Sequence, residues 1–137
     1  MPSIEGKHDG RSILLDVAIL AARDPMDITH RVYTGLLDTG ATKSWITPRV
    51  INDLQLSELG KETVSVATEE RLVTTHIFRV GLFPPTINSV SMPYVFPEIV
   101  GCCLKQTIKF DVLIGMDILS QTDFCLQKDR SWKLQFG

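Results

Sequence analysis

The sequence lacks the residue patterns that are typical of metal-binding, membrane-spanning, secreted and nucleic-acid-binding proteins. Its three cysteines and three histidines lack the spacing of metal ligands. No apolar run approaches the roughly 18 residues that cross a bilayer, and the first residues do not read as a signal peptide. Lysine and arginine are not clustered, and 14 basic against 16 acidic side chains give a formal net charge of −2. We therefore expect a cytoplasmic protein without a metal site that binds neither nucleic acid nor membrane.

The length and the cysteine content point to one reduced domain. A chain of 137 residues with 44% hydrophobic side chains can bury one ordinary core. Residues 1–11 are polar and show no periodicity, so we expect a flexible tail followed by a single domain over residues 12–137. We expect packed, reduced thiols at Cys102, Cys103 and Cys125, with redox activity of the adjacent pair as the alternative.

Short β-rich runs alternate with turn signals along most of the sequence. Thr47-Pro48 predicts the start of a short helix, and a second short helix is expected at 116–121. Pro93 and Pro97 predict edge strands and loops for the stretch that runs through Val90 to Val100. The fold class is therefore all-β, a small closed barrel-like lobe with one or two short helices. The strands are expected at 13–20, 31–37, 44–46, 62–67, 72–80, 110–114, 124–127 and 132–136.

One motif carries possible chemistry. The triplet Asp38-Thr39-Gly40 follows the apolar pair Leu36-Leu37, and Ala41 follows the triplet. A strand end followed by a tight turn can aim a carboxylate into a cleft, because glycine allows close approach of backbone and threonine offers a hydroxyl. A second apolar run, 110–114, ends at Gly115 and could brace that turn.

The triplet with its flanks and the run Leu113-Ile114-Gly115 leading into 116–119 resemble the retropepsins, the retroviral-type aspartic proteases. Bacterial members and the retroviral-like domain of DNA-damage-inducible proteins are especially similar. The resemblance implies an aspartic endopeptidase in which Asp38 is catalytic while Thr39 and Gly40 hold its geometry. Aspartic catalysis needs two carboxylates and no cofactor, and the triplet occurs once, so the resemblance implies a homodimer acting on a peptide substrate.

The resemblance also implies a flap and a set of substrate contacts. The predicted hairpin 62–80 has the position of the flap that covers the cleft in retropepsins, although its expected tip, Thr68 to Arg71, contains no glycine. An ordinary surface hairpin is the alternative. The candidate substrate-binding residues come from the turn, the hairpin and the buried strand: Ala41, Ala67, Thr68, Val112 and Ile114. Ordinary packing is the alternative role for these residues.

Some positions depart from the retropepsin pattern. An ion pair ties the half-sites together in retroviral proteases, but the matching positions here are Thr42 and Met116. Asp117 is an alternative polar anchor, although a solvated acid at a helix start is the preferred interpretation. His76 is expected on the surface. These departures leave a second hypothesis open, a non-catalytic peptide-binding or dimerisation module with the same fold.

Overall fold

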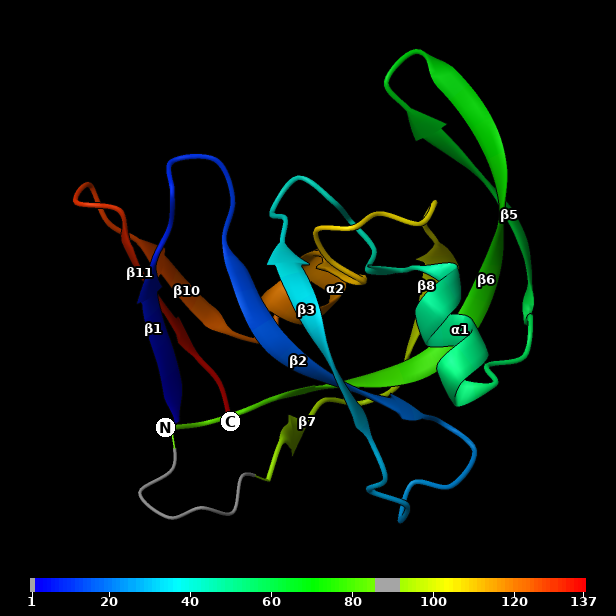
Figure 1. Ribbon diagram of the computed structural model, residues 1–137, viewed down its shortest axis with the longest axis horizontal. Coiled ribbons are helices and arrows are strands. Elements are labelled where there is room, and N and C mark those ends of the chain that lie inside the picture. Colours follow the sequence, from blue (N-terminus) through cyan, green and yellow to red (C-terminus); the bar gives the residue numbers. More distant parts are fainter. Residues whose placement is uncertain (1, 86–91) are drawn as a thin grey trace.

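The computed structural model describes residues 2–85 and 92–137 (Figure 1). Its helices are α1 (Pro48–Leu54) and α2 (Met116–Leu119). Its strands are β1 (Ser3–Lys7), β2 (Leu14–Ala21), β3 (Arg31–Leu37), β4 (Trp45–Ile46), β5 (Gly60–Val66), β6 (Glu69–Leu82), β7 (Tyr94–Val95), β8 (Ile99–Cys103), β9 (Val112–Ile114), β10 (Asp123–Leu126) and β11 (Ser131–Gln135).

The larger sheet closes on itself. Its strand order is β2-β3-β9-β4-β8-β6-β5, and β6 also pairs with β2, so six of these strands form a ring. Most neighbours are antiparallel, but β3 runs parallel to β9 and β4 runs parallel to β8. A closed ring leaves few unpaired strand edges. The predicted all-β barrel with two short helices is confirmed.

The core fills the ring and extends beneath the second, smaller sheet. Side chains of β2 and β6, such as Ile19 and Phe78, are fully buried and belong to one cluster with Val112 of β9. Trp132 and Leu134 of β11 belong to the same cluster. Buried and partly buried residues alternate along β11, which is the period-2 pattern that the sequence shows.

The long strand β6 serves two parts of the molecule. Its first half pairs with β5 from Gly60 opposite Thr75 to Val66 opposite Glu69, and its second half pairs with β8 and β2 inside the ring. In Figure 1 the β5–β6 hairpin extends beyond the barrel on the side where β3 ends. The predicted hairpin is confirmed, but its tip is the two-residue turn Ala67-Thr68 rather than Thr68 to Arg71.

Two expectations about strand placement were wrong. The N-terminal segment does not form a frayed tail, because β1 pairs with β11 in a three-stranded sheet of order β1-β11-β10. The sequence of β1 shows little alternation of polar and apolar residues, so it gives no clear strand signal. Its backbone hydrogen bonds depend on the pairing with β11. The stretch containing Pro93 and Pro97 is also not confined to edges, since β8 lies between β4 and β6. Val90 lies outside the described residues.

The helices follow the sequence closely. Thr47 occupies the N-cap position of α1 and Pro48 its first turn, as predicted, and Val50 is the buried residue of its apolar side. The Thr47 hydroxyl, however, donates to Asp111 at 2.8 Å instead of capping the helix. Neither helix in the described part of the chain has the length and hydropathy that crossing a bilayer requires.

Arg79 holds the loop between β2 and β3 in place. The residue is 8% exposed, and its guanidinium donates to the backbone carbonyls of Ala21 at 2.6 Å and Asp27 at 2.7 Å. Further bonds reach the carbonyls of Asp24 and Pro25. A buried charge is tolerable when its donors are satisfied in this way.

We expect Arg79→Met to lower the free energy of unfolding by about 3 kcal/mol, because the buried guanidinium is the shared donor to several loop carbonyls. Arg71→Met removes an exposed arginine from the same strand and should change it by less than about 0.5 kcal/mol. Urea denaturation of both variants and the parent chain measures the difference. Equal effects of the two substitutions would show that the Arg79 bonds contribute nothing specific.

Candidate functional site

Asp38 lies where β3 leaves the sheet, as the motif predicts. Its backbone N–H donates to the carbonyl of Ile114 on the parallel neighbour β9 at 2.9 Å, which continues the ladder for one residue. The Gly40 N–H donates to Oδ1 of Asp38, also at 2.9 Å. The carboxylate is partly exposed, and Thr39 is exposed beside it. A strand end and a tight turn therefore orient one acid.

A second turn packs directly against the first. The Met116 N–H donates to the carbonyl of Ala41 at 2.7 Å. Gly115 is buried between the turns, and a Cβ at this position would overlap the backbone carbonyl of Lys43. Only glycine fits there without moving the turns apart. The predicted bracing of the Asp38 turn by the segment that ends at Gly115 is confirmed.

Ser44 and Asp117 fasten the two turns together. Asp117 accepts the Ser44 hydroxyl at 2.7 Å and the Ser44 backbone N–H at 2.8 Å. The Gly115 N–H in turn donates to Ser44 Oγ at 3.0 Å, and Ser44 is fully buried. The preferred interpretation of Asp117 as a solvated acid was therefore wrong, because both carboxylate oxygens accept hydrogen bonds from Ser44 of the same chain. We call this arrangement of residues 38–44 and 114–117 the two-turn joint.

A cleft of about 490 Å³ separates the two-turn joint from the β5–β6 hairpin. The predicted residues Asp38, Gly40, Ala41 and Ala67 lie together along it. Other residues of the lining were not predicted from the sequence: Thr42, Lys43, Trp45, Glu62, Val64, Ser65 and Cys102. The Asp38 turn and the tip of the hairpin, the two ends of the predicted site, therefore face one cleft.

Three candidate substrate contacts do not lie on this cleft. Val112 and Ile114 have no exposed surface, because both side chains of β9 point into the core. Their prediction as cleft walls was wrong, and packing, the alternative role, is what they show. Thr68 is exposed at the hairpin tip but does not line the cleft.

Lys43 and Glu62 form an ion pair across the cleft. Nζ of Lys43 lies 2.6 Å from Oε2 of Glu62, and each side chain is 40% exposed. The hydrogen bond to Glu62 raises the pKa of Lys43, so the ammonium stays charged at neutral and acidic pH. The sequence could have indicated that Glu62 lines the cleft, because it lies in an alternating strand on the same face as Val64. No pattern near Lys43 indicated that Glu62 would be its partner.

The tip of the hairpin has an unusual backbone. Ala67 adopts a φ of 55°, in the left-handed region that favours glycine. A two-residue turn needs such an angle to match the twist of the strands. Because the turn contains no glycine, Ala67 adopts this positive φ angle instead.

Two other side chains of interest are buried away from solvent. His76 is 4% exposed, and its ring nitrogens bond the Ser57 carbonyl and the Thr74 hydroxyl, both at 2.9 Å. Its expected surface position was wrong, because β6 turns this face toward the chain that follows α1. Cys102 has no exposed surface, and burial, followed by the nearby charge of Glu62, raises the pKa of its thiol.

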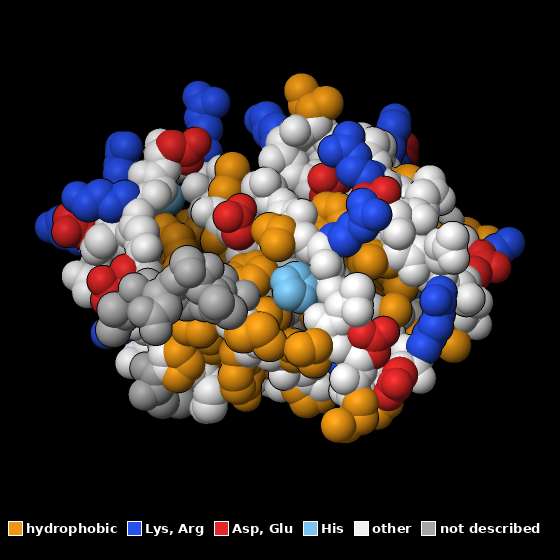
Figure 2. Space-filling view, turned by 60° about the horizontal axis from the view of Figure 1, so that its bottom comes forward, with side chains coloured by type: hydrophobic (Ala, Val, Ile, Leu, Met, Phe, Trp, Pro, Cys, Tyr) orange, Lys and Arg blue, Asp and Glu red, His pale blue; other side chains and the backbone are white. Residues whose placement is uncertain are grey.

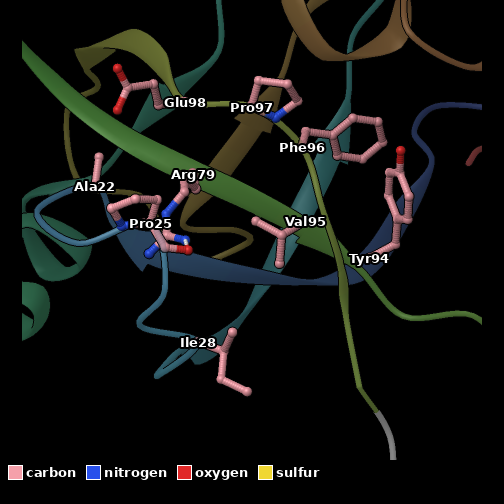
Figure 3. Close-up of a pocket in the computed structure, with 9 residues that line it drawn as sticks. All are labelled: Ala22, Pro25, Ile28, Arg79, Tyr94, Val95, Phe96, Pro97 and Glu98. Carbon is pink, nitrogen blue, oxygen red and sulfur yellow. Dashed lines mark hydrogen bonds between the residues drawn. The ribbon is translucent and has the colours of Figure 1, made fainter.

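A second hollow of about 550 Å³ lies beside the loop between β2 and β3. Figure 2 shows hydrophobic side chains gathered on this side of the molecule, where Met26, Ile28 and Tyr94 are exposed. In Figure 3 Arg79 points toward the loop and the Glu98 carboxylate points away from the other lining residues. Because the Arg79 donors are used by loop carbonyls, the hollow offers little polar chemistry.

We compared the chain with protein families, curated proteins and solved structures. The model of a family described as aspartyl protease matches residues 25–118, more than half of the chain. The chain is similar to a retropepsin-like aspartic protease from Rickettsia conorii, with 15% identity, a TM-score of 0.63, and 98% of this chain and 90% of that chain covered. It also matches the retroviral protease-like domain of Ddi1 from Leishmania major, with 16% identity, a TM-score of 0.41, and coverage of 85% and 82%. Curated proteins gave no significant match.

These matches confirm the resemblance that the sequence suggested. The family match includes the Asp38 turn and Gly115. The structural similarity supports a retropepsin-like fold, in agreement with the closed ring of strands.

We expect Asp117→Ala to lower the free energy of unfolding by about 3 kcal/mol, because the buried Ser44 donors lose their charged acceptor. Asp117→Asn should cost less, since its amide oxygen can accept one of the two bonds. Asp16→Ala removes an exposed acid from β2 and serves as the control, with a change within about 0.5 kcal/mol. Thermal and urea denaturation measure all three. An Asp117→Ala variant as stable as the control would show that the carboxylate does not hold the joint.

Cys102 should react much more slowly with iodoacetamide than Cys125 in the folded chain at pH 8. The raised pKa of Cys102 lowers its thiolate fraction at this pH, and the side chain is buried, whereas Cys125 is exposed. Mass spectrometry of the labelled peptides over time gives both rates. In denaturant the two rates should converge; equal rates in the native protein would contradict the burial of Cys102.

Proposed function

Because the chain belongs to the aspartyl protease family, we propose that it is an aspartic endopeptidase whose active site forms between two copies of the chain. Each copy supplies Asp38, and the two carboxylates hold one proton and a water molecule between them. The observation that carries the proposal is the cleft that Asp38 shares with the β5–β6 hairpin.

The chemistry follows from two acids in close proximity. Two facing carboxylates repel each other when both are ionised, so in aspartic proteases the pair holds one proton, and one carboxylate acts as a base while the other acts as an acid. The ionised Asp38 takes a proton from the water, which attacks the carbonyl carbon of the substrate, while the protonated Asp38 donates to the carbonyl oxygen. The roles reverse when the amine leaves. The Gly40 N–H holds the orientation of each carboxylate.

A second copy is needed because the cleft of one chain, as far as its residues are described, offers no free second acid for this work. Glu62 is paired with Lys43, and Asp117 is bound to Ser44. These are the other acids close to the turn in the described residues, and both are already engaged. A two-fold axis beside Asp38 would bring its own copy opposite, which is the commonest symmetry of oligomers.

The β5–β6 hairpin has the position of a flap. It forms one wall of the cleft through Glu62, Val64 and Ala67. A substrate that enters as an extended strand would lie between this wall and the two-turn joint, where closure excludes water. Ala41 and Ala67 are the small apolar contacts in our proposal.

The two-turn joint weakens one argument for a non-catalytic module, namely that the ion pair of retroviral proteases is missing. Thr42 and Met116 cannot form the ion pair of retroviral proteases, but hydrogen bonds from Ser44 to Asp117 and from Met116 to Ala41 connect the same two turns. The scaffold that a catalytic Asp38 needs is thus present. The three free thiols suit a reducing compartment, and we include a cytoplasmic location in the proposal.

We expect the purified chain to cleave peptides best at mildly acidic pH, within about pH 4 to 7, because Ala41 has no hydroxyl to favour the charged carboxylate. Asp38→Asn should reduce cleavage at least about 100-fold, as loss of a general base does. Mass spectrometry of a digested peptide library measures both, with Asp16→Asn as the control that retains activity.

Sedimentation at the assay concentration tests the two-copy site. Active protein should be dimeric, and a monomer that cleaves would contradict the shared site. Equal cleavage by the parent and by Asp38→Asn would remove Asp38 from the mechanism. Peptide binding without any cleavage would favour the non-catalytic module.

A further inference from the structure

The cleft is not chemically uniform. Along β5 the partly buried Glu62 and Val64 both line the cleft, and Val64 lies nearer the hairpin tip than Glu62. Near the tip the lining side chains are small and uncharged: Val64, Ser65 and Ala67. Toward the base of the hairpin the lining contains Lys43 and Glu62. One end of the cleft therefore presents an ion pair to whatever lies in it.

The two partners retain capacity for further hydrogen bonds. An ammonium group has three N–H donors, and a carboxylate has four acceptor sites on two oxygens. Their mutual hydrogen bond of 2.6 Å uses one of each. Both side chains are 40% exposed, so an incoming group can reach them.

An ion pair of this kind discriminates against a full charge. A charged side chain placed here would meet one attractive and one repulsive partner only 2.6 Å apart, so the two interactions largely cancel. The side chain would still lose its hydration, which costs free energy. An aliphatic side chain would strip water from Lys43 and Glu62 and return no hydrogen bond.

An amide matches both partners at once. Its oxygen can accept from the Lys43 ammonium while its NH₂ group donates to the Glu62 carboxylate, and the ion pair stays intact. Cys102 borders this region but has no exposed surface, and the raised pKa of its thiol disfavours a competing negative charge.

We propose that Lys43 and Glu62 form an amide-selecting subsite, so that the chain prefers peptides with a glutamine or asparagine side chain at the position that reaches this end of the cleft. The inference rests on the proposed peptide-binding function of the cleft and identifies the class of substrate. It assigns to the Lys43–Glu62 pair a role in specificity in addition to joining the hairpin to the catalytic turn.

The test compares residue preferences of matched variants on one randomised peptide library. The parent chain should favour Gln or Asn at one position by about fivefold over Leu, Glu or Lys, the value of one ordinary hydrogen bond. Glu62→Gln leaves the Lys43 cation unpaired and should shift the preference to acidic residues. Lys43→Met leaves the Glu62 anion and should shift it to basic residues. The exchanged pair, Lys43→Glu with Glu62→Lys, should keep the preference for amides.

Two variants control for charge on the same hairpin. Lys61→Met and Glu70→Gln alter exposed residues that do not line the cleft, and both should keep the parent profile. Melting temperatures identify any variant that is not folded. If all variants show the parent profile, or if the parent favours charged or aliphatic residues at every position, the subsite is refuted.

A second readout separates this inference from the proposed catalysis. The same library is bound to Asp38→Asn forms of each variant, and the retained peptides are sequenced. Absence of cleavage that depends on Asp38 would overturn the endopeptidase, but the binding profiles would still decide the amide preference. Cleavage with profiles that do not respond to Lys43 or Glu62 would overturn the subsite alone.

Discussion

The orientation of Asp38 depends on the hydrogen-bonded contact between two turns. The parallel strands β3 and β9 end side by side, and each is followed at once by a turn. The Met116 N–H bond to Ala41 and the Ser44 bond to Asp117 then join the two turns. Since these segments are far apart in the chain, the contact exists only once the ring of strands has closed. The carboxylate is thereby held on a rigid scaffold, which is what a catalytic group requires.

The strand β6 connects this scaffold to the wall opposite. Half of it completes the ring through β2 and β8, and the other half carries β5 over the cleft. The Lys43–Glu62 pair adds a direct link between the loop that follows Asp38 and the hairpin. Charges around the cleft are therefore used in pairs, apart from Asp38, whose proposed partner is its own copy. In our proposal, this distribution lets one short chain combine a polar specificity element with an acid that a second copy of the chain completes.

The sequence predicted the elements whose signals are local and missed those that depend on a partner. Residues 31–37 form a strand with the predicted bounds, since alternation and flanking turns act within a few residues. Residues 3–7 carry almost no such signal, and their strand is created by pairing with β11. Val112 and Ile114 read equally well as core or cleft, because a buried strand has no polar face to mark its direction. Their burial required knowledge of the strands on both sides.

The triplet at Asp38 and the apolar run before Gly115 were sufficient to indicate an aspartic protease fold, because a strand end, a tight turn and a bracing segment have composition requirements that are local. Only the tertiary structure decided which polar groups meet. Lys43 and Glu62 are 19 residues apart, and Ser44 and Asp117 are 73 apart. Their contacts follow from the closed ring, which brings β5 and the start of α2 beside the loop that contains Lys43 and Ser44. No local sequence pattern records this proximity, because the partners come from distant parts of the chain.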